Sequence, residues 1–291
     1  MILVALLLGA LGVADLARTR LRGTRTAWVP AALGILAFGV GSFGTGQAWW
    51  WVPAAAAAVV AWVLSTREPA NASALLGRRA PGQRAGYWAV GGLAVTIAAA
   101  FAWGSALPTA SGFLVDWYSA LPYPGLRGVG FVTFALTACL VVFLVESANV
   151  VVRLALRGER SSDPASPVAA ASSATSTRRS VRWWRRPRTA DAATDARSLV
   201  PAPLVEPEPL VELKGGRFIG PLERLFVLAL LLTGQYTALA AVIAAKGIVR
   251  FPEISRDAAG GSKAEYFLVG SFASWALVMI AALLIGLGVG A

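Results

Sequence analysis

The sequence predicts an all-α, polytopic membrane protein, with about seven transmembrane helices and a disordered cytoplasmic insertion. Two observations favour this fold class. Hydrophobic residues make up 57% of the chain and charged residues 14%, whereas a soluble domain has about 45 to 50% apolar and about 25% charged residues. Long uncharged stretches also recur along the chain, and about 20 apolar residues suffice for a helix to cross a hydrocarbon layer of roughly 30 Å.

The charge pattern indicates how these helices are oriented. The 26 basic residues outnumber the 15 acidic ones, 23 of them are arginines, and most lie in three segments between apolar stretches. Arginine and lysine collect on the cytoplasmic side of membrane proteins. The pattern therefore favours a multi-pass protein of the bacterial cytoplasmic membrane, with the lipid bilayer as its partner, over a nucleic-acid-binding protein.

The residue types present exclude several kinds of site. The chain has no histidine and a single cysteine, Cys139, inside an apolar stretch. This excludes histidine-dependent catalytic triads and zinc motifs as well as an intramolecular disulfide. We expect Cys139 to face lipid or to pack in the core, and we expect no enzymatic activity, cofactor or metal.

Residues 1–156 are predicted to form a membrane bundle of about five helices. The first apolar stretch precedes a run of arginines instead of following one, so we expect a retained helix with its N-terminus outside, not a cleaved signal peptide. The tryptophans at positions 49–51 are typical of an interface belt, and a ligand-stacking cage is the alternative. The predicted spans are residues 1–17, 27–40, 48–65, 87–103 and 129–154, with a short interfacial helix at 113–120.

Residues 157–212 are predicted to be a disordered cytoplasmic linker. They are rich in Ser, Ala, Thr, Pro and Arg without apolar periodicity, so they cannot bury enough surface to offset the entropy of folding. A basic and aromatic cluster within them favours binding to anionic lipid headgroups; a solvated linker without a ligand, RNA binding or a protein partner are alternatives. The candidate lipid contacts are Arg178, Arg179, Arg182, Trp183, Trp184, Arg185, Arg186 and Arg188.

Residues 213–291 are predicted to form a C-terminal transmembrane hairpin. Two uncharged stretches, 225–245 and 266–291, are each long enough to cross the bilayer as one helix. With the five spans before the linker they make seven, with the N-terminus outside and the C-terminus inside. This topology has one exception to the rule that basic residues lie on the cytoplasmic side, because the segment 246–265 would lie outside with four basic residues. We expect contacts with other residues to hold these side chains.

Several short motifs mark the C-terminal region: GGRFIGPLER at 215–224, GQ at 234–235, AK at 245–246 with VRFPE at 249–253, and EYFLVGS at 265–271 with SW at 274–275. In these motifs residues 213–280 resemble a family of uncharacterised bacterial integral membrane proteins, a domain of unknown function. AN at 148–149 and VR at 152–153 look like the preceding segment of that family. The resemblance implies a membrane location and brings no activity.

Polar residues in the last three predicted spans form the candidate functional site. Glu146, Asn149 and Arg153 fall on one helical stripe and are expected to face the bundle interior. A lone charge in lipid is costly, so we expect opposite charges to pair between helices. The expected pairs are Glu146 with Arg224, Arg153 with Glu223, and Glu265 with Lys246 and Arg250. Gln235 completes the candidate network, because it lies eleven residues before Lys246 and on the same helical face.

Three functional classes fit these features. The first is a non-enzymatic structural or regulatory membrane component, whose linker engages lipid headgroups or an unidentified protein partner. The alternative is a small-solute or ion transporter or channel that uses Glu146, Gln235, Lys246 and Arg250 as a polar path. An intramembrane enzyme comes third, because the chain offers no paired catalytic carboxylates or metal set.

Overall fold

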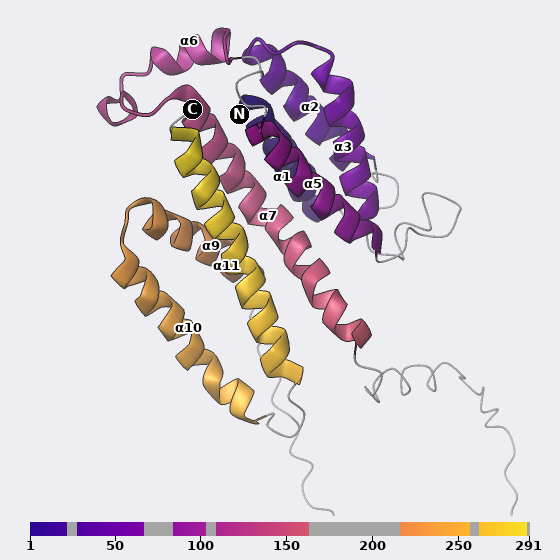
Figure 1. The fold of residues 1–291 in the computed structure, drawn as a ribbon, viewed down its shortest axis with the longest axis vertical. Helices are drawn as coiled ribbons and strands as arrows, with labels where there is room; N and C mark the ends of the chain where they lie inside the picture. Colours follow the sequence, from indigo (N-terminus) through magenta and orange to yellow (C-terminus); the bar gives the residue numbers. More distant parts are fainter. Residues whose placement is uncertain (22–27, 67–83, 103–108, 163–215, 257–261, 290–291) are drawn as a thin grey trace, which may run out of the picture.

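The computed structural model describes residues 1–21, 28–66, 84–102, 109–162, 216–256 and 262–289. These residues form nine α-helices and one short 3-10 helix, and no strand occurs among them, which confirms the predicted all-helical fold class (Figure 1). In this part of the chain, four helices are long and apolar enough to cross a membrane. Their apolar stretches are Ile2–Arg20, Ala85–Ala102, Phe131–Leu156 and Phe267–Gly288.

The centre of the molecule is the contact between helix α1 (Ile2–Arg20) and the long helix α7 (Phe131–Ser162). Two glycines of α1 allow the close approach. A Cβ at Gly12 would lie 2.9 Å from the backbone of α7, and one at Gly9 would lie 2.8 Å from the Sγ of Cys139. Small residues let helix backbones come close in a membrane, where packing drives helix association. Cys139 therefore packs in a helix contact.

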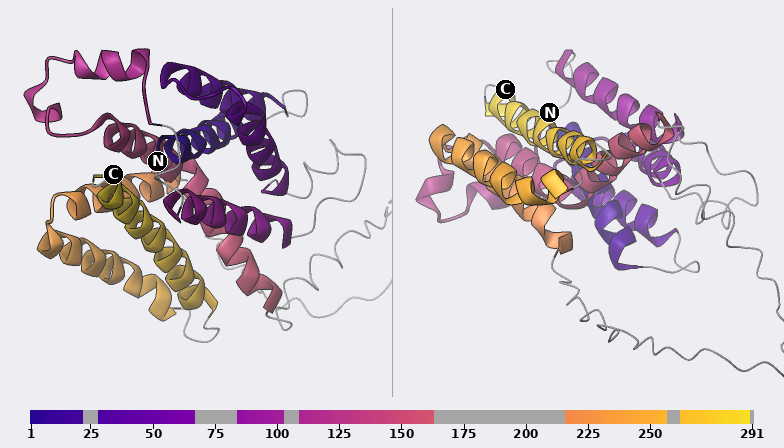
Figure 2. Two further views of the ribbon diagram at one scale, coloured as in Figure 1. Left: turned by 45° about the horizontal axis from the view of Figure 1, so that its top comes forward. Right: turned by 90° about the horizontal axis from the view of Figure 1, so that it is seen from below.

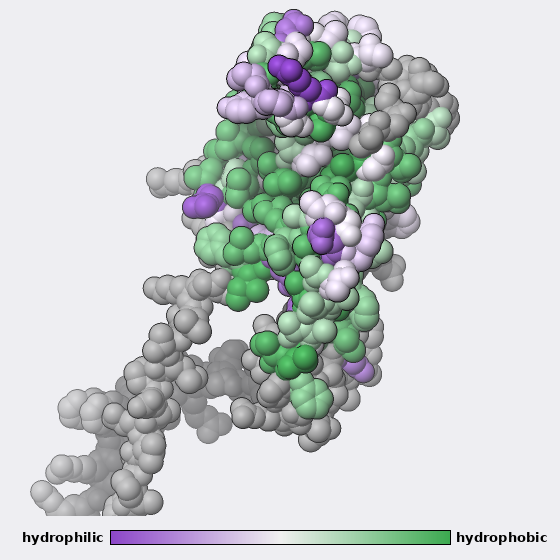
Figure 3. All heavy atoms as spheres, turned by 90° about the vertical axis from the view of Figure 1, so that its left-hand side faces the viewer, coloured by the Kyte–Doolittle hydropathy of each residue, from purple (hydrophilic) through white to green (hydrophobic). Residues whose placement is uncertain are grey.

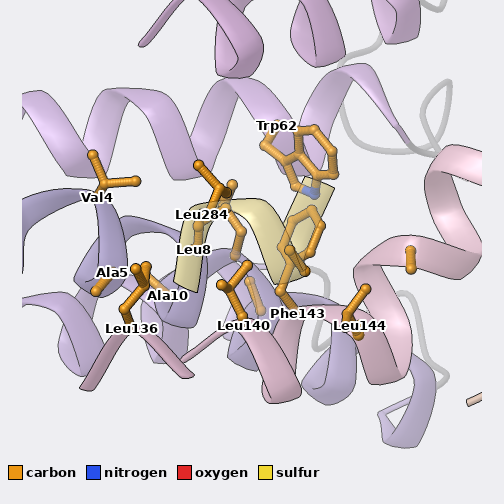
Figure 4. Close-up of a cluster of buried hydrophobic side chains, with 14 of the residues drawn as sticks. Val4, Ala5, Leu8, Ala10, Trp62, Leu136, Leu140, Phe143, Leu144 and Leu284 are labelled. Atoms are coloured by element: carbon orange, nitrogen blue, oxygen red, sulfur yellow. The ribbon is translucent and has the colours of Figure 1, made fainter. Parts of the chain in front are cut away.

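Three further helices pack around α1. They are α2 (Val29–Gly44), α3 (Trp51–Ser65) and α5 (Arg84–Ala102), and their positions closely match the predicted spans. Figure 4 shows the buried core, in which Trp62 of α3 lies beside Phe143 of α7 with 6.4 Å between the ring centroids. The core thus joins segments far apart in the sequence.

A short helix, α6 (Phe113–Ser119), caps one end of the bundle, as predicted for residues 113–120. Its buried Tyr118 donates a hydrogen bond to the carbonyl oxygen of Val129 at 2.8 Å. The same ring lies 4.8 Å from that of Phe134 in α7. Phe113 and Trp117 are exposed, so α6 turns one aromatic face toward α7 and another outward. The 3-10 helix Pro124–Leu126 then leads into α7.

The C-terminal region differs from the prediction, because residues 225–245 do not form one helix. Helix α9 (Gly216–Leu232) ends before Gly234, which has a φ of +70°, and α10 (Tyr236–Arg256) runs back from that turn (Figure 1). Glycine tolerates this left-handed conformation, which ends many helices. The prediction of a single span is wrong here because an uncharged stretch can turn at a glycine without any charge to mark the turn.

Helix α11 (Ser262–Val289) completes the fold and runs antiparallel to α7, against which it packs. Helices α9, α10 and α11 lie on one side of α7, and α2 and α3 lie on the other (Figure 2). The face that carries α10 is mainly hydrophobic over its middle (Figure 3). Ile248, Val249 and Phe251 of α10 are exposed. Exposed apolar surface of this kind marks a membrane or partner contact.

Candidate functional site: charged residues between helices

Arg224 of α9 is the centre of the C-terminal polar network. Its side chain is buried, with 4% of the residue exposed. The Nε atom donates a hydrogen bond to the Oγ of Ser274 in α11 at 3.0 Å, and Nη1 donates to the carbonyl oxygen of Leu144 in α7 at 3.1 Å. One guanidinium group therefore connects three helices. A planar group with several fixed donors suits this bridging role better than a lysine does.

Glu146 of α7 lies next to this arginine. It is buried, and it interacts electrostatically with Arg224, the partner expected from the sequence. Asn149, one turn further along α7, donates from Nδ2 to the Oε2 of Glu146 at 3.4 Å and to the carbonyl oxygen of Val145 at 3.1 Å. The structure thus brings together three of the predicted network residues.

Glu223 has a different partner from the predicted one. Both of its carboxylate oxygens accept hydrogen bonds from the Nζ of Lys246 in α10, at 2.6 and 2.8 Å. Trp275 of α11 donates from Nε1 to the same carboxylate at 3.2 Å. The expected pair with Arg153 is wrong, because α10 folds back and brings Lys246 to Glu223. Arg153 is exposed and donates from Nε to the carbonyl oxygen of Asn149.

The aromatic rings of α11 complete the environment of Lys246. Its Nζ lies 5.8 Å from the ring centroid of Phe267 and 5.4 Å from that of Trp275. A cation over an aromatic face gains about 0.5 to 2 kcal/mol, more when water is excluded. The expected pair of Lys246 with Glu265 is therefore also wrong, since the ammonium group is engaged by Glu223 and the two rings.

The remaining predicted residues are not gathered into this network. Gln235 lies exposed at the turn between α9 and α10, and Glu265 is exposed in the first turn of α11. The side chain of Arg250 lies outside the described residues, as does the whole basic and aromatic cluster from Arg178 to Arg188. Gln235 directly precedes α10, whereas Lys246 lies near the middle of that helix, about 16 Å further along its axis.

A second polar cluster, which was not predicted from the sequence, joins α1 to α3. Asp15 is fully buried and forms an ion pair with Arg18 one turn away. Its Oδ2 also accepts a hydrogen bond from the Nε1 of Trp62 at 3.0 Å. Arg18 in turn donates from Nη1 to the Oγ1 of Thr66 at 3.0 Å. The available signal was the single acid in the first apolar stretch, followed three residues later by an arginine.

The two clusters share one chemical property, which is that charge is neutralised across helices. Asp15, Glu146 and Arg224 are the buried charged residues of the described ranges, and each interacts with a residue of another helix. Such contacts offset the cost of placing a charge in a region of low polarity. Within the described ranges, no group of three or more His, Cys, Asp or Glu side chains is arranged to hold a metal ion.

No protein-family model, curated protein or solved structure matches this chain. The resemblance of residues 213–280 to a family of uncharacterised bacterial membrane proteins stays a prediction.

Proposed function

We propose that this chain is a non-enzymatic integral membrane protein with a structural or regulatory role. One observation carries the proposal: the buried charges serve as contacts between helices. Arg224 joins α9 to α7 and α11, and Asp15 joins α1 to α3. Charged groups in a solute path must exchange partners as the solute passes, whereas these groups are held by several neighbours at once. This favours a role in holding the bundle together.

The proposed location is a bacterial cytoplasmic membrane, crossed several times. Four long apolar helices support a membrane-spanning chain, and the segregated arginines support a cytoplasmic position for the linker of residues 157–212. In this proposal the linker is the regulatory part, because six arginines and two tryptophans between residues 178 and 188 are suited to anionic headgroups. A protein that presents anionic groups is the second possible ligand of the linker.

The linker role can be tested on the complete chain. We would extract the protein from native membranes in lipid-preserving polymer discs and quantify the lipids and proteins that remain bound. The variant carries glutamine at the six arginine positions between 178 and 188, and the control carries lysine at the same positions. We expect wild type and the lysine control to retain more anionic lipid, or a stoichiometric protein partner, than the glutamine variant does. Equal retention by all three proteins would contradict the linker role.

A solute or ion path is the second candidate, and the depth of Arg224 favours it. The carbonyl oxygen that Arg224 contacts belongs to Leu144, which lies near the middle of the apolar stretch Phe131–Leu156. Charged residues at such depth often belong to transport sites. Proteoliposomes separate the two functions. A transport role requires that wild-type protein raise proton or potassium permeability and that Glu146→Gln remove the increase, whereas a structural role leaves the vesicles tight in both cases.

A further inference from the structure

The two arms of the α9–α10 hairpin meet at one level. Glu223 and Lys246 are 23 residues apart, and a continuous helix would separate them by about 35 Å. The structure instead places the Nζ of Lys246 2.6 Å from the carboxylate of Glu223. Each residue lies nine or ten positions from the end of its helix at the turn, so the arms are of similar length, about 14 Å. The chain therefore returns to the level from which it came.

The turn between the arms satisfies its own backbone groups. Thr233 donates its N–H to the carbonyl oxygen of Ala229, and Gln235 donates its N–H to that of Leu230 at 2.9 Å. The Thr233 hydroxyl also donates to Ala229, at 2.8 Å. With Gly234 left-handed, this is the usual glycine-terminated helix end. A turn with these groups paired can lie inside the hydrocarbon layer without water.

The positions of the helix ends show where the hairpin opens. Helix α1 ends at Arg20, α5 begins at Arg84, and α7 carries Arg153 nine residues before its end at Ser162. These ends lie at the same end of the bundle as the close of α10 and the start of α11 (Figure 1). We call this end, defined by Arg20, Arg84 and Arg153, the arginine face. The opposite end carries α6, the turn between α2 and α3, and both marked ends of the chain (Figure 1).

From these observations we infer that α9–α10 is a re-entrant hairpin, which enters the membrane from the arginine face and leaves it on the same side. The end of α10 and the start of α11 then meet the anionic leaflet together with the arginine face. The exception to the rule that basic residues lie on the cytoplasmic side disappears, because Arg250, Arg256 and Lys263 follow the second arm and lie on the basic side, while Lys246 is neutralised by Glu223. The chain crosses the membrane six times, through α1, α2, α3, α5, α7 and α11, and residues 1 and 291 lie on the same side.

Cysteine labelling of the full chain tests this inference, which rests on the proposed membrane location. In a Cys139→Ala background, single cysteines replace Glu265, Leu21 on the arginine face, and Tyr123 on the opposite end; all three positions are exposed. A membrane-impermeant maleimide is added to intact cells and to permeabilised cells. We expect Tyr123→Cys to react in intact cells, and Leu21→Cys and Glu265→Cys to react only after permeabilisation.

The result that overturns the inference is labelling of Glu265→Cys together with Tyr123→Cys in intact cells, because a single span over residues 225–245 requires it. A second measurement covers the case in which a cysteine variant fails to fold. Alkaline phosphatase is active only outside the cytoplasm. If it is fused after residue 291, the re-entrant hairpin predicts an active fusion, because the C-terminus then lies outside. Seven spans predict an inactive fusion, because the C-terminus then lies inside. Extraction of the unmodified chain by alkaline carbonate would instead refute the membrane location itself.

Discussion

The Asp15 cluster and the Glu223 cluster use the same chemistry in two different surroundings. In each, a carboxylate accepts hydrogen bonds from a basic side chain and from a tryptophan of another helix. The Asp15 side chain is fully buried between α1 and α3, whereas 17% of the Glu223 side chain and 24% of that of Lys246 are exposed. The Asp15 cluster lies within a closely packed core, and the Glu223 cluster holds α10 at the edge of the bundle.

This difference teaches that an ion pair takes its role from the helices it joins. Helices α1 and α3 are also held by apolar packing around Val59 and Trp62, so Asp15 adds to a contact that exists without it. Helix α10 packs mainly against α9 and exposes most of its side chains. The pair of Glu223 with Lys246 is thus a main attachment of α10 to the bundle, and breaking it should act locally.

Replacement of Asp15 by alanine is expected to have the largest effect. It leaves the Trp62 N–H without its acceptor and Arg18 without the carboxylate that pairs with it, and loss of one partner of a buried pair costs about 3 to 5 kcal/mol. Thermal unfolding of the detergent-solubilised protein should show a strongly lowered Tm, with loss of a monodisperse peak in size-exclusion chromatography. Asp116→Ala, at an exposed acid of α6, is the control. Equal Tm values for the two variants would refute a stabilising role for Asp15.

Arg224→Met is expected to destabilise the contact of α9 with α7 and α11 by about 3 kcal/mol, because it removes two hydrogen bonds and leaves Glu146 without that positive charge. The measurement is again the Tm, together with hydrogen exchange of α9. Arg153→Met is the matched control, since Arg153 is exposed and exposed substitutions change stability by roughly 0.5 kcal/mol or less. If Arg153→Met lost more stability than Arg224→Met, Arg224 would not be the central arginine of the network.

Glu223→Gln tests whether the Glu223 cluster acts only locally. We expect a loss of about 2 kcal/mol for the weakened charged hydrogen bonds, seen as faster hydrogen exchange in α10 with exchange in α1 and α3 unchanged. Exchanging the two charges, with Glu223→Lys and Lys246→Glu in one chain, should restore part of the protection, because the pair forms again without the Trp275 hydrogen bond. Uniformly faster exchange across the bundle would show that the two clusters do not differ.

The smallest expected effect is that of Gly234→Ala. A left-handed residue with a Cβ costs about 1 kcal/mol, so this variant should loosen the turn between α9 and α10 and slightly lower the Tm. Gly247→Ala is the matched control within α10, because a Cβ there would meet no atom within 4 Å and alanine favours a helix interior. If the Gly234 variant were the more stable of the two, the turn would not depend on the glycine.

Much of the N-terminal architecture could be predicted from the sequence. The helices α1, α2, α3, α5 and α7 follow predominantly apolar stretches bounded by arginines, glycines or prolines, and a helix in lipid satisfies its backbone hydrogen bonds locally. The candidate site was predictable in composition but not in pairing. Glu146 lies two residues after Leu144, whose carbonyl oxygen Arg224 contacts, whereas Glu223 binds Lys246 instead of Arg153 because the path of α10 decides which cation lies within reach.

By itself the sequence determined the all-helical class of the protein, since its apolar composition favours many apolar helices. Only the tertiary structure decided that residues 225–245 turn back at Gly234 and that Asp15 joins α3 through Trp62. The physical reason is that hydropathy adds up along the chain, so local sequence reports it. The path through a turn and the choice of an ion partner depend on distances between segments that are remote in sequence.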